Sequence, residues 1–132
     1  MTDKPSIYPA LRYADAAAAA DWLEHAFGFE TIATHRGENG QVAHAELRFG
    51  NGVIMLGSAR PDAFGTSPQQ LGGVTGSIYT YVEDVDAHAE RARAAGAEIL
   101  RGPQDTEYGS REYSVRDPEG QVWSFGTYLP EG

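Results

Sequence analysis

The first half of the chain places a helical pattern of apolar residues directly after a short extended stretch, residues 7–13. Four apolar residues recur at helical spacing and should face a sheet: Ala19, Leu23, Ala26 and Phe27. Asp15 is a good N-cap for this helix, and Gly28 can end it. Three strands are expected after the helix: residues 29–36, 41–49 and 53–57.

The second half repeats this order of elements. Residues 77–82 form an extended pattern, and a helix is expected between Asp84 and Gly96. A narrow apolar stripe marks its inner face: Val85, Ala89 and Ala92. Three strands follow: residues 98–101, 111–115 and 121–128. The segments GENG and GNG supply turns in the first half, and DPEG supplies one in the second.

An internal repeat links the two halves. Sliding the chain against itself by 68 places aligns four identical pairs: Gly28 with Gly96, Glu30 with Glu98, Arg48 with Arg116, and Gly52 with Gly120. The helix starts, Asp15 and Asp84, differ by 69 places, so the halves differ by one residue within their helical segments. The repeat predicts an α+β fold of two tandem βαβββ modules in a curved mixed sheet, with the helices on one side.

The predicted domain organisation is a single domain over residues 1–132. Its modules cover about residues 5–57 and 77–130. Residues 58–76, between the modules, are rich in Gly, Pro and Ser. This segment is either a linker or a loop over a site, because it is long for a connection in a compact domain.

Composition narrows the possible partners and sites. The formal charge of −9 disfavours an electrostatic grip on nucleic acid or on an anionic membrane. The chain has no cysteine, which excludes disulfides, thiolate metal sites and cysteine nucleophiles. The N-terminal MTDKPSIYP lacks the pattern of a signal peptide, and no window is apolar enough to span a bilayer. A cytoplasmic location is therefore expected.

Two segments carry a resemblance to a known family: LRYADAAAAADWLEHAFGF early in the chain and YGSREYSVRDPEGQVWSF late in it. Together with the paired modules they resemble the vicinal oxygen chelate superfamily, which includes glyoxalase I, extradiol dioxygenases and fosfomycin- and bleomycin-resistance proteins. The resemblance covers residues 7–128. Tyr108-Gly109-x-Arg111 followed by DPEG is its most specific part and is most similar to the bleomycin-resistance branch.

In metal-dependent members, the resemblance implies four ligands from the first and last strands of each module, all pointing into the cup of the sheet. The matching positions here are Tyr8, Met55, Ser77 and Ser124. For the second position the repeat register points to Leu56, but strand alternation favours Met55. None of the four is a usual metal ligand, so we expect no metal, no cofactor and no glyoxalase-type metal catalysis.

Strand alternation gives the side chains expected on the face opposite the helices, the cup face. With the four positions above it adds Arg12, Tyr79 and Tyr81, whereas Trp123 is expected in the core. Glu112, Ser114 and Arg116 face the cup or solvent.

His44 and Glu46 share the open face of their strand, as a metal pair, an acid/base pair or polar lining. The Tyr108 to Arg111 loop either borders a ligand site or stabilises its own turn. His25, His35 and His88 are expected at exposed positions.

Two hypotheses of function follow. The first is a metal-free binding protein, with no catalytic residues, that sequesters a small organic molecule with aromatic parts, such as a bleomycin-like antibiotic, in a crevice of a homodimer. Its expected ligand-binding residues are Tyr8, Arg12, His44, Glu46, Met55, Ser77, Tyr79, Tyr81, Tyr108, Arg111 and Ser124. The second is a glyoxalase-like lyase, isomerase or dioxygenase with a relocated metal or a His44–Glu46 acid/base pair.

Overall fold

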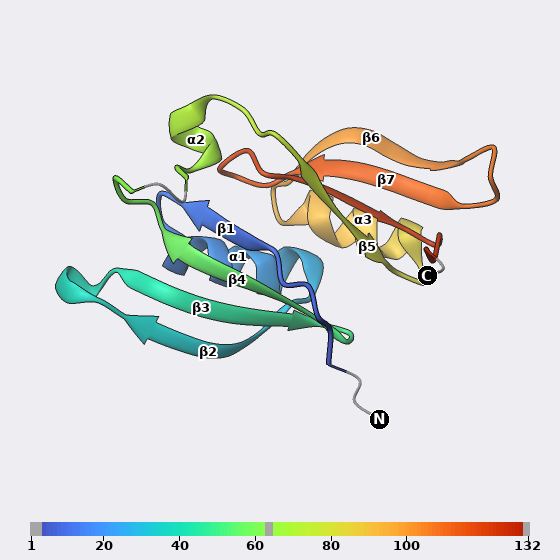
Figure 1. The fold of residues 1–132 in the computed structure, drawn as a ribbon. Helices are drawn as coiled ribbons and strands as arrows, with labels where there is room; N and C mark the ends of the chain where they lie inside the picture. The colour runs from blue at the N-terminus through green and yellow to red at the C-terminus, as the bar shows by residue number, and fades with distance from the viewer. Residues whose placement is uncertain (1–3, 63–64, 131–132) are drawn as a thin grey trace. The chain divides into compact units, whose positions relative to one another are not determined.

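The computed structural model describes residues 4–62 and 65–130. Its internal contacts divide the chain into two compact units, Met1–Gly72 and Gly73–Gly132 (Figure 1). Each unit contains one βαβββ module. Within the described residues, no helix combines the length and apolar character needed to cross a bilayer.

The first module has a four-stranded sheet with one helix against it (Figure 1). Its elements are β1 (Ala10–Tyr13), α1 (Ala16–Phe27), β2 (Glu30–Arg36), the 3₁₀ turn Glu38–Gly40, β3 (Val42–Phe49) and β4 (Gly52–Ser58). The strand order is β1-β4-β3-β2, with β1 parallel to β4 and the other pairs antiparallel. A short helix, α2 (Pro68–Leu71), lies within the segment expected to be a linker or loop.

The second module repeats this topology. Its elements are β5 (Ser77–Tyr81), α3 (Val85–Ala94), β6 (Glu98–Asp105), β7 (Arg111–Arg116) and β8 (Val122–Gly126). The strand order is β5-β8-β7-β6, with β5 parallel to β8. The predicted α+β fold of two βαβββ modules is confirmed. The strand pairing gives each module its own four-stranded sheet rather than one shared sheet.

The helix boundaries follow from the residues that predicted them. Asp15 and Asp84 each accept a hydrogen bond at 3.0 Å, from the backbone N–H groups of Ala18 and Ala87. Gly28 and Gly96 both have a left-handed φ, 91° and 93°, which glycine adopts without steric cost. The helices therefore begin and end where the sequence pattern places them.

Two of the repeated identities form an ion pair in each module. Arg48 Nη2 lies 2.6 Å from Glu30 Oε1 in the first module, and Arg116 Nη1 lies 2.9 Å from Glu98 Oε2 in the second. In each case the two residues are directly opposite each other on neighbouring antiparallel strands. These exposed pairs contribute little stability, and they mark the same register in both sheets.

The register of the last strands shows which residue of the first module, Met55 or Leu56, corresponds to Ser124 in the second. Arg48 lies opposite Val53, whereas Arg116 lies opposite Val122, so the second hairpin contains one residue more than the first. The repeat offset of 68 therefore becomes 69 beyond the turn, and Met55 corresponds to Ser124. Leu56 is buried on the helix side, as strand alternation predicts.

The core of each module lies between its helix and its sheet. In the first module, the largest fully buried side chains are Tyr13, Leu23, Phe27, Leu47 and Leu56. In the second module they are Tyr113, Val115, Trp123 and Phe125. The prediction that Trp123 is a core residue is confirmed.

One histidine expectation is wrong. His88 is only partly exposed, because its ring packs 4.2 Å from the Phe125 ring and its Nδ1 lies 2.6 Å from the Tyr113 hydroxyl. The alanine-rich face of α3 leaves room for an imidazole between the helix and the sheet.

Strand β6 also extends past its predicted end at Arg101, because pairing with β7 resumes after the Gly102-Pro103 break.

Candidate functional site

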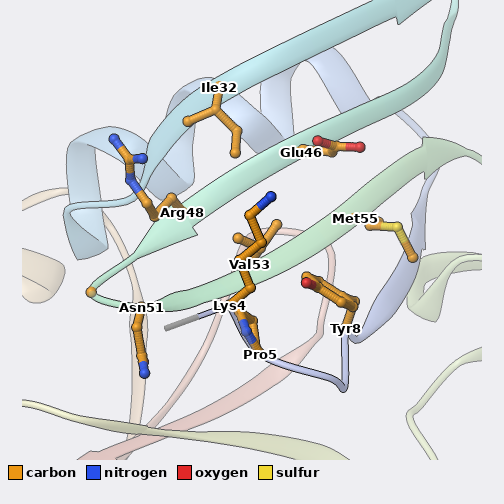
Figure 2. A pocket seen from close by; sticks show the side chains of 10 residues that line it. Lys4, Pro5, Tyr8, Ile32, Glu46, Arg48, Asn51, Val53 and Met55 are labelled. Carbon is orange, nitrogen blue, oxygen red and sulfur yellow. The ribbon is translucent and has the colours of Figure 1, made fainter. Parts of the chain in front are cut away.

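An open hollow lies on the cup face of the first module and encloses about 930 Å³ (Figure 2). Side chains from β2, β3, β4 and the segment before β1 project toward this common space. The lining residues are Lys4, Pro5, Tyr8, Ile32, Glu46, Arg48, Gly50, Asn51, Val53 and Met55. Of the expected site residues, the hollow brings together Tyr8, Glu46 and Met55.

The apolar part of this lining is exposed to an unusual degree. Tyr8 is 38% exposed and Ile32 is 42% exposed, although both are large hydrophobic residues. Val53 and Met55 lie on β4 beside them and are half-buried. A ligand that covered these four side chains would remove apolar surface from water, which is favourable in proportion to the area.

Ile32 is a lining residue that sequence reasoning missed. The pairing of β2 with β3 shifts between Thr31 and Ala33, so Ile32 is the additional residue of a β-bulge. Ile32 is two places from Glu30, whose register partner Arg48 also lines the hollow, so strict alternation already places Ile32 on the cup face. The bulge reverses the alternation after Ile32, so that Thr34 lies on the helix side beside α1.

A hydrogen-bonded pair, His44 and Glu46, lies at the edge of the hollow. His44 Nε2 lies 2.8 Å from Glu46 Oε2, and the His44 ring stacks on the His35 ring with a centroid distance of 6.0 Å. Glu46 lines the hollow, whereas His44 lies beside it. This geometry fits polar lining, and it also has the base-and-orienter contact that an acid/base pair requires.

Arg12 lies on β1 but does not line the hollow. Its Nη2 donates to Asp62 Oδ2 at 3.1 Å, and its register partner on β4 is Gly57. Arg12 therefore holds the segment that follows β4. A ligand in the hollow would not need it.

The cup face of the second module carries a tyrosine–carboxylate cluster. The Tyr108 hydroxyl lies 2.9 Å from both carboxylate oxygens of Glu112, to which it donates. The Tyr79 hydroxyl donates to the backbone carbonyl of Tyr128 at 2.6 Å. The alternation that put Glu112 on this face did not predict its burial or its tyrosine partner.

Glu112 affects the acidity of both neighbouring phenols. Its hydrogen bond with Tyr108 raises the pKa of that hydroxyl, and its negative charge adds to the effect. The pKa of Tyr79 is raised first by burial and then by the charge of Glu112. Both tyrosines are therefore neutral hydrogen-bond donors at physiological pH.

Ser77 and Tyr81 lie on β5, the edge strand of the second sheet, and Ser124 lies on the neighbouring strand β8. Ser124 Oγ is 2.8 Å from Ser114 Oγ, and Ser124 is the register partner of Tyr79. Ser77 and Tyr81 are exposed at the two ends of β5. Ser124 and Tyr79 thus share one surface with the Glu112 cluster.

Arg111 lies on the other face of its strand. Its guanidinium donates to both carboxylate oxygens of Asp86 on α3, at 2.9 and 3.0 Å, and to Asp105 at 3.1 Å. The hydrogen bond from Arg111 lowers the pKa of Asp86. These contacts suit the turn-stabilising alternative better than contact with a ligand.

A model of the Glyoxalase/Bleomycin resistance protein/Dioxygenase superfamily matches residues 7–125. The chain belongs to this superfamily. It is 36% identical over 131 residues to the uncharacterized protein Mb0911c of Mycobacterium bovis, covering 97% of this chain and 86% of that one. Among solved structures, TioX from Micromonospora sp. ML1 is 35% identical with a TM-score of 0.74, covering 94% of this chain and 100% of that chain.

The fosfomycin resistance protein FosX from Mesorhizobium loti shares the fold, with a TM-score of 0.66. The alignment covers 98% of this chain and 95% of FosX at 17% identity. This likeness supports the fold assignment only.

The residues that the resemblance places at the metal positions are not usual metal ligands. They are Tyr8 and Met55 in the first module and Ser77 and Ser124 in the second. Divalent metals in such sites take imidazole nitrogen or carboxylate oxygen, which none of these side chains offers. Within residues 4–62 and 65–130, no three His, Asp or Glu side chains are grouped to hold a metal ion.

Proposed function

We propose that this superfamily member binds a planar, partly aromatic small molecule on its cup face, without a metal and without chemical turnover. The observation that carries the proposal is the hollow of the first module, where exposed Tyr8 and Ile32 stand beside Val53 and Met55. By sequestering its ligand, such a protein would protect a cell from a toxic compound of the bleomycin type.

The chemistry of the lining favours an aromatic ligand. A tyrosine ring stacks on planar groups, and a methionine thioether makes favourable contacts with aromatic edges. The hollow, at about 930 Å³, is large enough for a drug-sized molecule. Lys4 and Glu46 at its border provide charged groups that could fix the orientation of such a molecule.

The proposal that the ligand is an antibiotic rests on the comparisons with known proteins. Bleomycin resistance proteins give the superfamily part of its name. Tyr8, Ile32, Val53 and Met55 give the lining an apolar part, and of its two cations, Lys4 and Arg48, the second is paired with Glu30. The apolar part suits a bulky organic molecule better than a small phosphonate.

Homodimerisation is part of the proposal, because a second copy could close a surface that one chain leaves open. Light scattering at micromolar concentration should therefore give twice the chain mass. A monomer under these conditions would remove the shared-crevice arrangement from the proposal and leave the hollow itself in place.

An enzyme is the alternative function, and the 2.8 Å contact between His44 and Glu46 is the observation that favours it. The joint substitution His44→Ala and Glu46→Ala separates the two functions. It abolishes activity if the pair is an acid/base dyad. It leaves the fold and the binding of aromatic ligands largely intact if the pair is polar lining.

Tyr8→Ala is expected to weaken binding of metal-free bleomycin by about 10- to 100-fold, because one aromatic wall of the hollow is lost. Calorimetric titration measures the change, and mass spectrometry of the recovered ligand tests whether it is altered. Ile7→Ala is the matched control, since Ile7 is the neighbouring residue, is highly exposed and does not line the hollow.

Equal losses for Tyr8→Ala and Ile7→Ala would place the binding surface elsewhere. Conversion of the ligand would refute a function by sequestration alone. Absence of saturable binding by the unsubstituted protein would refute the bleomycin-type assignment.

A further inference from the structure

The tyrosine–carboxylate cluster of the second module (Tyr79, Tyr108, Glu112 and Tyr128) surrounds a buried carboxylate with aromatic rings. The Glu112 side chain is only 8% exposed, and its two oxygens accept from the Tyr108 hydroxyl. A carboxylate has room for about four hydrogen bonds, so one hydroxyl leaves most of its capacity open. A buried carboxylate of this kind favours a positively charged partner.

The neighbouring strand β8 leaves space for the Glu112 side chain. Gly126 is the register partner of Glu112, and a β-carbon at position 126 would lie 2.5 Å from the Glu112 Cγ and 3.0 Å from the Tyr79 hydroxyl. Only glycine leaves space for both side chains. The position of the carboxylate is therefore fixed by the backbone of β8.

The tyrosine rings form a corner that is open to solvent. The Tyr128 ring stands edge-on to both others, with centroid distances of 5.7 Å to Tyr108 and 6.3 Å to Tyr79. Tyr108 is 63% exposed and Tyr128 is 45% exposed. A cation attracted to Glu112 would meet the exposed rings of Tyr108 and Tyr128, and aromatic ring faces attract positive charge.

One cation of the chain lies near the carboxylate. Arg101 Nη2 is 3.9 Å from Glu112 Oε1, too far for a hydrogen bond, and the Arg101 side chain is half-exposed. Arg116, further along the same face, is paired with Glu98. Arg111 is bound by Asp86 and Asp105 on the helix side. Arg101 is therefore the group of this surface that would compete for Glu112.

We propose that this cluster binds a cationic nitrogen group, a protonated amine or a methylated ammonium, with the tyrosine rings as walls and Glu112 as the counter-charge. The proposal goes beyond the proposed function, because it concerns a separate site on the second module. The net charge of −9 would also favour the approach of a cation.

Choline and its neutral isostere 3,3-dimethyl-1-butanol are the probes that test the proposal on the full chain. In ¹H–¹⁵N NMR titrations, choline should saturably shift the amides of residues 108–112 and 126–128. The neutral isostere should bind at least about tenfold more weakly, since it has the same shape and no charge. Equal binding of the two probes would overturn the proposal.

Substitutions test whether choline binding depends on the charge of Glu112. Glu112→Gln should weaken choline binding by about tenfold, because it removes the charge and keeps the shape. Glu107→Gln is the matched control, an exposed carboxylate that makes the same change in net charge nearby. Equal effects of the two substitutions would show that choline responds only to net charge, which contradicts the proposal.

Two further variants have effects of opposite sign. Arg101→Gln should strengthen choline binding, because it removes the competing cation. Tyr108→Ala should weaken binding by removing a wall, whereas Tyr108→Phe keeps the ring and should retain binding. The same spectra report whether each variant is folded. If Glu112→Gln does not fold, weaker choline binding by a folded Arg101→Gln variant would refute the proposal on its own.

Failure of this site and failure of the proposed function give different results. Tyr8-dependent bleomycin binding without choline binding would overturn only the cation site. Choline binding that depends on Glu112, without any binding of bleomycin, would keep the cation site and overturn the assignment to bleomycin-like ligands.

Discussion

Trp123→Ala should lower the free energy of unfolding by about 3–5 kcal/mol, the usual loss for removal of a fully buried aromatic side chain. Trp123 has no exposed surface, and its ring stacks 6.4 Å from that of Phe125. Its indole N–H donates to Asp117 Oδ2 at 3.1 Å. The substitution therefore leaves both a cavity and a buried carboxylate oxygen without this donor.

Urea denaturation followed by circular dichroism measures the loss. Trp22→Ala is the control, because Trp22 is only partly buried and contacts Phe27 edge-on at 5.0 Å. It should cost clearly less than Trp123→Ala. Equal costs would mean that Trp123 is not the centre of the second core.

Asp117→Ala is expected to cost about 2–4 kcal/mol, because buried donors lose their acceptor. Asp117 Oδ1 accepts from the backbone N–H groups of Glu119, Gly120 and Gln121 at 3.0–3.1 Å, and Oδ2 accepts from Trp123. The N–H groups of the partly exposed residues can bind water instead. Those of Gln121 and Trp123 are buried and cannot.

The control for this substitution is Asp15→Ala, which removes an exposed N-cap and should cost only about 1 kcal/mol. Both variants lose one negative charge, so a difference between them reports the hydrogen bonds. Denaturation at neutral pH gives both values. A cost for Asp117→Ala no larger than that for Asp15→Ala would refute the structural role given to the DPEG turn.

Much of the fold could be predicted because its signals are local. Asp15 and Asp84 cap the helices by hydrogen bonds to residues three places ahead. Gly28 and Gly96 end them in a conformation that other residues rarely adopt. The repeated Glu and Arg residues pair across the same register in each module. Each of these features depends on residue type and spacing alone.

The features that sequence reasoning missed depend on tertiary contacts. Thr34 lies on the helix side because pairing with β3 introduces a bulge after Thr31. Glu112 is buried because Gly126, on a different strand, leaves space for it. His88 is held by Tyr113 and Phe125 across the core. None of these contacts leaves a mark in the local sequence pattern.

Some of the predicted site residues line the hollow and others do not. The resemblance pointed to Tyr8 and Met55, strand alternation placed Glu46 on the open face of its strand, and all three line the hollow. Alternation from Tyr8 also predicted Arg12 in the site, but Arg12 pairs with Asp62 and does not line the hollow. Arg12 lies four residues further along than Tyr8, opposite Gly57 rather than beside Met55, and so does not reach the hollow.

The most direct test of the account is a thermal-melt series on chelator-stripped protein with Zn²⁺, Ni²⁺, Mn²⁺ and Fe²⁺ added separately. The claim under test is that the chain keeps the superfamily fold while the positions matched to metal ligands hold Tyr8, Met55, Ser77 and Ser124. A bound metal at a hundred times its dissociation constant stabilises a protein by about 2.7 kcal/mol. For a domain of this size that raises the melting temperature by roughly 5–15 °C.

The account predicts unchanged melting temperatures with all four ions. A clear rise with any one of them would contradict it. His44 and Glu46 would then be the first residues to substitute in search of the metal site.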